Sequence, residues 1–170
     1  MILEKLGITG VQLKAMIGAI IIKLSTAVIT CWGNINLYFL SCFHYQGTIV
    51  TPQTNSIILL LSVPTMMITM LIAIKLCKKY GFEFIIRVAC IVFFISPLVN
   101  LIGFNIYLFT IFSILVPGSM YSLISVPVLN CIWTQFPASK NRATSILVIA
   151  FGIGSIVWNF LFMHMINPNN

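Results

Sequence analysis

The sequence predicts an all-α, polytopic membrane protein with five transmembrane helices, and three observations support this fold class. Hydrophobic residues make up 60% of the 170 positions and charged residues only 6%, with a mean hydropathy of +1.10. A water-soluble domain needs far more charge on its surface. The long apolar runs also lack the alternation of a membrane barrel, so the chain must cross the bilayer as helices that satisfy their own backbone hydrogen bonds.

The apolar runs divide the chain into five expected spans, which form a single transmembrane domain over residues 1–170. The spans cover about residues 15–42, 55–77, 84–103, 106–133 and 143–166. The first run is far too long for the core of a signal peptide, so we expect it to stay as a span. Residues 84–133 would be about 75 Å long as a helix with a rise of ~1.5 Å per residue, which requires two crossings with a turn at 103–105. Pro64 favours a kink in the second span.

The first span carries the most unusual residues for a membrane helix. Lys23 lies within it, where it either extends its stem to the lipid headgroups or serves as an internal functional charge. Four polar or aromatic residues follow near the far end: Trp32, Asn34, Asn36 and Tyr38. Their hydrogen-bonding groups are costly in lipid, so we expect them to point inward. They either line a substrate path or hydrogen-bond neighbouring helices.

The fourth span contains a second candidate for the path. Tyr121 and Ser125 are four residues apart and therefore share one side of this helix. They either face the same path or bond a neighbouring helix. We expect Pro117-Gly118 and Pro127 to break the span.

The fourth and fifth spans form a hairpin around the link 133–142. In the fifth span, Gly152, Gly154 and Ser155 predict close packing against another helix, because small residues let two backbones approach. For this cluster we prefer a packing surface over a binding site.

Basic residues occur in every second connection between the spans. The lead has two Lys or Arg, the second link four and the fourth link two, whereas the first link, the third link and the tail have none. The positive-inside rule then predicts a cytoplasmic N-terminus and an external C-terminus. The cytoplasmic loop residues that we single out are Lys78, Lys79, Gly81 and Arg87 in the second link, and Lys140 and Arg142 in the fourth.

Several classes of function find no support in the sequence. The basic residues are too scattered for a nucleic-acid surface, in spite of a net charge of +7. His44 and His164 lie far apart, as do Glu4 and Glu83, so neither a metal site nor a pair of catalytic carboxylates is expected. We therefore predict no enzymatic activity, no cofactor and no metal.

Three stretches resemble the major facilitator superfamily of transporters, most closely its oxalate:formate antiporter and monocarboxylate branch. The link from Trp133 to Ser145, followed by 150–155, is similar to the branch pattern WFP..RG.ATG....G.G.GS. Residues 31–38, CWGNINLY, resemble a W-G-N element late in the first span, and the basic link 75–87 stands where the superfamily has a loop motif. The chain departs from these patterns at Lys78, where the motif has an acidic residue, and at Ala143, where it has a glycine.

The resemblance implies the N-terminal portion of a secondary transporter that moves a small organic anion, a monocarboxylate or oxalate or formate, by alternating access. Such transporters bind substrate between two halves of six spans each. With only one wall of a central site, the chain alone is expected to be inactive. The alternative is a non-transporting membrane interaction protein or accessory subunit. The expected partners are the lipid bilayer, an organic anion once a second half completes the site and, in the alternative, another membrane protein.

Overall fold

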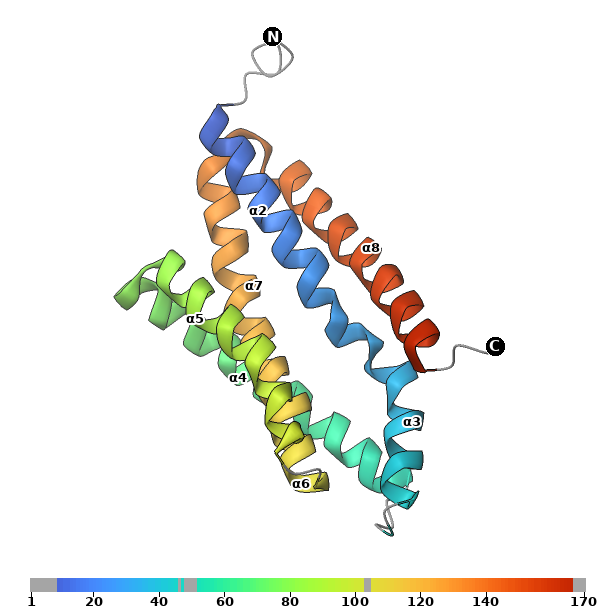
Figure 1. Cartoon of the computed structure of the whole chain (residues 1–170). Helices are drawn as coiled ribbons and strands as arrows, with labels where there is room; N and C mark the ends of the chain where they lie inside the picture. Colours follow the sequence, from blue (N-terminus) through green and yellow to red (C-terminus); the bar gives the residue numbers. More distant parts are fainter. Residues whose placement is uncertain (1–8, 46, 48–51, 103–104, 167–170) are drawn as a thin grey trace. The chain divides into compact units, whose positions relative to one another are not determined.

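A computed structural model of the chain describes residues 9–45, 47, 52–102 and 105–166, of which 96% are helical (Figure 1). The α-helices are α2 (Gly10–Thr26), α3 (Trp32–Tyr45), α4 (Pro52–Tyr80), α5 (Phe82–Ile95), α6 (Ile106–Phe109), α7 (Val116–Gln135) and α8 (Lys140–Ile166). Three 3₁₀ segments, η1 (Ala27–Cys31), η2 (Ser96–Leu101) and η4 (Pro137–Ser139), and one π-helix, η3 (Thr110–Leu115), connect or extend them.

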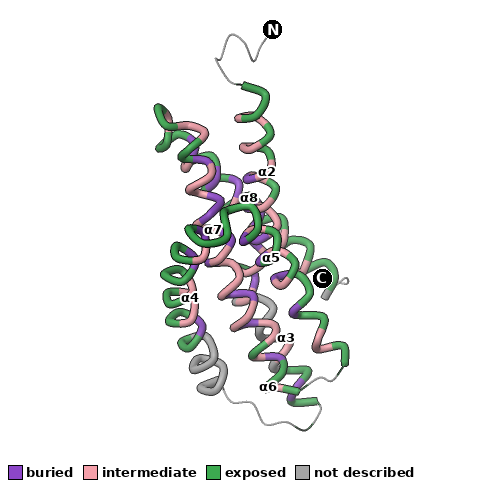
Figure 2. Tube along the Cα trace, turned by 90° about the vertical axis from the view of Figure 1, so that its left-hand side faces the viewer, coloured by how far each residue is buried: buried purple, intermediate pink, exposed green. Residues whose placement is uncertain are grey.

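Five helical stretches are long and apolar enough to cross a membrane, which confirms the all-α polytopic prediction. They are Gly10–Cys31, Leu60–Tyr80, Phe82–Leu101, Ile106–Gln135 and Pro137–Met165. Each overlaps one expected span. The fourth is the most enclosed, with 44% of its apolar window buried against 17–22% in the others. Figure 2 shows the corresponding contrast between the mostly exposed α4 and the largely covered α7.

The first span begins earlier than expected and is not one continuous α-helix. Thr9 and Gln12 form a capping box: the Thr9 N–H donates to Gln12 Oε1 at 2.9 Å, and the Gln12 N–H donates to Thr9 Oγ1 at 3.3 Å. The helix therefore starts at Gly10. It changes to the 3₁₀ segment η1 after Thr26 and resumes as α3.

The expected breaks at the prolines of the fourth span are wrong. α7 continues through Pro127, and Pro117 lies inside its first turn. The irregular segment is instead the π-helix η3, which ends two residues before Pro117. Proline clashes with the carbonyl four residues before it, and a widened preceding turn relieves that clash without ending the helix. Asn105 caps α6, as the expected turn requires, while residues 103–104 lie outside the described part of the chain.

The chain forms two compact units. Unit 1 comprises residues 1–35 and 129–170, and unit 2 comprises residues 36–128. In unit 1, α2 and η1 run side by side with α8 in the same direction (Figure 1). The face of α2 that is buried repeats at helical spacing through Ala19, Lys23 and Thr26.

Unit 2 is built around α4, α5 and the irregular helices that follow them. Its buried residues on α5 recur every four positions, at Ile85, Ala89 and Phe93. Phe109 on α6 contacts two rings of α3, with centroid distances of 4.3 Å to Phe39 and 5.5 Å to Phe43. These aromatic contacts anchor the end of α3 to the start of the fourth span.

Candidate functional site

In unit 1, the α2–η1 segment and α8 approach each other closely at Gly154. A Cβ added to Gly154 would lie 2.6 Å from the Leu24 carbonyl oxygen and 2.8 Å from Ala27 Cβ. Real Cβ atoms do not tolerate such distances to backbone, so only glycine fits there. A Cβ on Gly152, by contrast, would meet nothing within 4 Å, and this residue is exposed. The close packing is therefore centred on Gly154.

Hydrogen bonds join the two helices on either side of this glycine. The Trp158 indole N–H donates to the Leu24 carbonyl at 2.9 Å, and the Thr30 and Ser155 hydroxyls lie 2.6 Å apart. Leu24 stands where the α-helical hydrogen-bond pattern changes to the 3₁₀ pattern of η1, since the Ala27 N–H bonds Lys23 and Ser25 carbonyls. Carbonyls at such a transition need partners from elsewhere. The indole supplies one, so α8 supports the break in the first span.

Lys23 lies on the buried face of α2, next to this break. The residue is only 7% exposed, and its Nζ is 6.0 Å from the centroid of the Phe151 ring on α8. Lys23 is about 20 Å along the helix from Gly10, which exceeds half of the roughly 30 Å hydrocarbon thickness. Of the two interpretations of Lys23, these positions favour an internal charge over a side chain that extends to the headgroups.

Two threonines lie at the change from α2 to η1. Thr26, which is almost fully buried, donates to the Ile22 carbonyl at 2.8 Å, and Thr30 donates to the Ala27 carbonyl at 2.7 Å. The candidate site is thus a buried cation, the buried Thr26 hydroxyl and a 3₁₀ break at one helix contact, with the exposed Thr30 hydroxyl at its edge. The sequence does not predict either of the two contacts described here, Lys23 with Phe151 and Leu24 with Trp158. The available signal was the i, i+4 spacing of Gly154 and Trp158, which places both on one face of α8.

The residues expected to line a path are spread over both units. Trp32 opens α3 in unit 1 and is half-buried, whereas Tyr38 belongs to unit 2 and is exposed. Asn34 and Asn36 lie within helical backbone, but their side chains are outside the described part of the structure. Tyr121 and Ser125 are both half-buried on α7 in unit 2. Their shared path remains a prediction.

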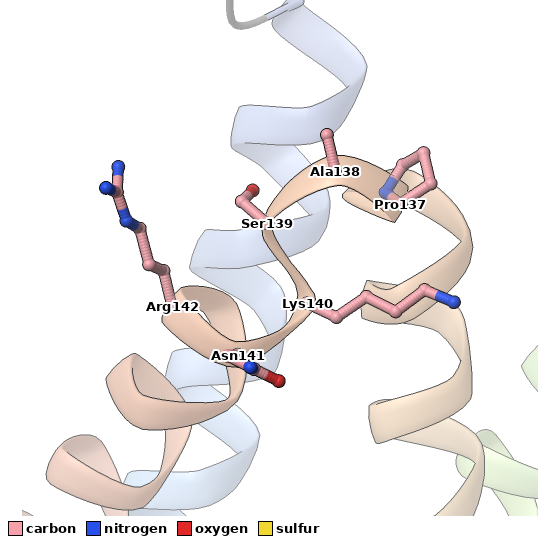
Figure 3. A pocket seen from close by; sticks show the side chains of 6 residues that line it. All are labelled: Pro137, Ala138, Ser139, Lys140, Asn141 and Arg142. Atoms are coloured by element: carbon pink, nitrogen blue, oxygen red, sulfur yellow. The ribbon is translucent and has the colours of Figure 1, made fainter.

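The residues expected in cytoplasmic loops fall at two tight helix junctions. Lys78 and Lys79 lie in the last turn of α4, and Gly81 alone separates α4 from α5. Arg87 on α5 pairs with Glu83 at 3.0 Å. Lys140 and Arg142 begin α8 beside an open hollow of about 500 Å³ lined by residues 137–142. Figure 3 shows these two side chains pointing away from each other, so they do not converge on a common ligand.

The described residues contain no cluster of side chains suited to metal binding, and their cysteines form no disulfide. Within that part of the chain, no three His, Cys, Asp or Glu side chains group closely enough to hold a metal ion. The cysteines at 31, 42, 77, 90 and 131 are free thiols.

No family model, curated protein or solved structure matches the chain.

Proposed function

We propose that the chain is part of a secondary transporter of the major facilitator type, which moves a small organic anion across a membrane by alternating access. The observation that carries the proposal is the burial of Lys23 on the packing face of the first span. Ionisable residues inside membrane helices are costly, and they mark substrate or ion pathways. A buried ammonium group suits a carboxylate, which is the charged group of monocarboxylates, oxalate and formate.

The break in the first span supports the same proposal. Transporters build central sites from interrupted helices, because non-helical backbone at membrane depth is tolerated where it is covered by protein or lines a cavity. Here η1 begins four residues after Lys23, and α8 contacts both sides of the change, with Trp158 donating to Leu24 of α2 and Ser155 bonding Thr30 of η1. A charge and a local change from α- to 3₁₀-helix thus lie together.

The type of transporter is inferred from the resemblance to major facilitator motifs, which is carried by residues 133–155, 31–38 and 75–87. Alternating access needs two halves around one site. We therefore propose that further spans, in the same polypeptide or another one, supply the opposite wall. The chain alone should then give no saturable uptake of labelled oxalate, formate, lactate or pyruvate in liposomes.

A charge-removal experiment tests the proposed role of Lys23. Membrane vesicles from cells that express the chain together with the spans that complete it should take up one of these anions, and Lys23→Gln should abolish that uptake. Lys14→Gln is the matched control, because it removes one positive charge from an exposed position of the same helix. Equal uptake by both variants would overturn the assignment to Lys23. Absence of uptake in every setting, together with a stoichiometric membrane partner that does not transport, would favour the accessory subunit instead.

The proposed orientation, with the N-terminus in the cytoplasm and the C-terminus outside, rests on the alternation of basic links. Epitope tags at the two ends should react from opposite sides of the membrane. Tags in the same compartment would contradict an odd number of crossings.

A further inference from the structure

The charge of unit 2 is concentrated at one end of two spans. Every Lys, Arg, Asp and Glu of residues 36–128 lies between Lys75 and Arg87. We call residues 75–87 the α4–α5 turn. The rest of the unit has no Lys, Arg, Asp or Glu, so the formal charge of the unit lies entirely at this end.

The backbone holds this charge at the level of the lipid headgroups. Gly81, with φ of +83°, is the single residue between the end of α4 at Tyr80 and the start of α5 at Phe82. Both helices are long and apolar enough to be spans, so their junction must lie at a membrane surface. With so short a connection, the lysines stay within about 8 Å of the end of the span.

Three lysines share one side of the last turns of α4. Lys75, Lys78 and Lys79 stand at i, i+3 and i+4, and all three are exposed. The only acidic residue of unit 2, Glu83, pairs with Arg87 at 3.0 Å. The net positive charge of the turn therefore resides mainly on the lysine face.

Aromatic rings accompany the lysines, as is typical of segments at a membrane interface. Lys79 Nζ lies 5.1 Å from the centroid of the Tyr80 ring, and Tyr80 lies 6.0 Å from Phe84. Tyr80, Phe82 and Phe84 are all exposed. Aromatic rings of this kind prefer the depth of the lipid headgroups.

We propose that the α4–α5 turn is a binding surface for anionic phospholipids, with Lys75, Lys78 and Lys79 contacting the headgroup phosphate. Basic clusters next to membrane spans attract such lipids with a strength that grows with each lysine. The link at Lys140 and Arg142 is the natural comparison, because its two cations point apart (Figure 3) and no exposed lysine triplet forms there.

The test uses the purified full chain in vesicles of phosphatidylcholine and phosphatidylglycerol. The association of each lipid with the protein is measured with spin-labelled lipids or by native mass spectrometry. Wild type should prefer phosphatidylglycerol, and Lys78→Gln with Lys79→Gln should weaken that association by about fivefold per lysine removed. Lys140→Gln with Arg142→Gln, which also removes two charges, should change it by less than about twofold.

Further measurements distinguish a lipid headgroup from free phosphate as the ligand, and a loss of binding from misfolding. Lys78→Arg with Lys79→Arg should retain the preference, and far-UV circular dichroism checks the helix content of every variant. A wild type with no preference for phosphatidylglycerol would overturn the proposal, even if no variant folds. So would an equal loss in the two Gln double variants, or displacement of the lipid by inorganic phosphate at matched ionic strength.

Discussion

In unit 1, two side chains of α8 hydrogen-bond the first span, in addition to bonds that hydroxyls make to their own helix, whereas in unit 2 three threonines inside the spans bond carbonyls of their own helix. Trp158 and Ser155 of α8 reach Leu24 and Thr30 of the first span. In unit 2, by contrast, Thr65, Thr69 and Thr110 donate to carbonyls three or four residues earlier in the chain. The Asn100–Ser113 bond of 2.6 Å is an exception, and it joins the two irregular helices η2 and η3.

The same contrast holds for charge. Unit 1 buries Lys23 inside a helix contact, while unit 2 keeps its cations exposed at the α4–α5 turn. Apolar packing and close approach suffice to hold helices together in lipid, so a hydrogen-bonded contact around a buried cation indicates a more specific role. The contact between α2 and α8 should therefore be sensitive to small changes of shape and polarity, and the outer faces of the helices should not be.

The largest effect should come from filling the space at Gly154. Gly154→Val places new atoms against the Leu24 carbonyl, a backbone group that cannot move aside as a side chain can. We expect the free energy of unfolding of the purified chain, measured by titration with a denaturing detergent, to fall by about 3 kcal/mol. Gly152→Val has the same helix propensity and open space around it, and should change stability by less than about 0.5 kcal/mol. Similar losses in both variants would show that glycine flexibility, rather than close approach, matters on α8.

Replacement of Lys23 should change the free energy of unfolding in the opposite direction, as a gain in stability. Lys23→Met removes a charge from a buried position and keeps a long, flexible side chain, so we expect the free energy of unfolding to rise by about 2 kcal/mol. The same change at the exposed Lys14 should have little effect. A gain in stability accompanied by a loss of anion uptake would identify Lys23 as a residue kept for function at the expense of stability. A large loss of stability would instead indicate a structural role for the ammonium group.

The long spans could be predicted because each is an apolar run that matches the thickness of the bilayer. Their ends were harder to place. The first helix starts at Gly10 because Thr9 and Gln12 cap it, and this two-residue signal lies outside the apolar run. That start also moves Lys23 towards the middle of the span, which favours an internal charge over a side chain that extends to the headgroups. The π-helix before Pro117 could not be expected, since a proline alone does not determine whether the chain bends or the preceding turn widens.

The sequence did not predict which helices pack against each other. Small residues at 152–155 predicted a packing surface but did not identify its partner, because the positive-inside rule orders helices across the membrane and carries no information about which ones touch. The structure supplies α2 as that partner, and it shows that the contact depends on Gly154 and Ser155 rather than Gly152.

The indole of Trp158 allows a finer test of how α8 supports the break in the first span. Trp158→Phe keeps a ring but removes the donor to the Leu24 carbonyl, and should lower the free energy of unfolding by about 1.5 kcal/mol. Trp133→Phe is the matched control: its indole also donates a single bond of 2.9 Å, but to the exposed Thr144 hydroxyl, which water can replace. Hydrogen exchange at residues 27–31 should accelerate only in the Trp158 variant. Equal exchange in both would mean that η1 is stable without the indole.

The smallest effect should come from the hydroxyl pair between Thr30 and Ser155. Ser155→Ala leaves Thr30 bonded to the Ala27 carbonyl, so only one hydrogen bond between helices is lost. Such bonds in membrane proteins contribute about 0.6 kcal/mol on average, and we expect a loss of that size in the detergent titration. Ser145→Ala on the same helix removes a hydroxyl that bonds its own helix at Asn141, and should be neutral. A double-mutant cycle with Thr30→Val should recover a coupling energy close to the single loss; a coupling of zero would show that the two hydroxyls contribute independently.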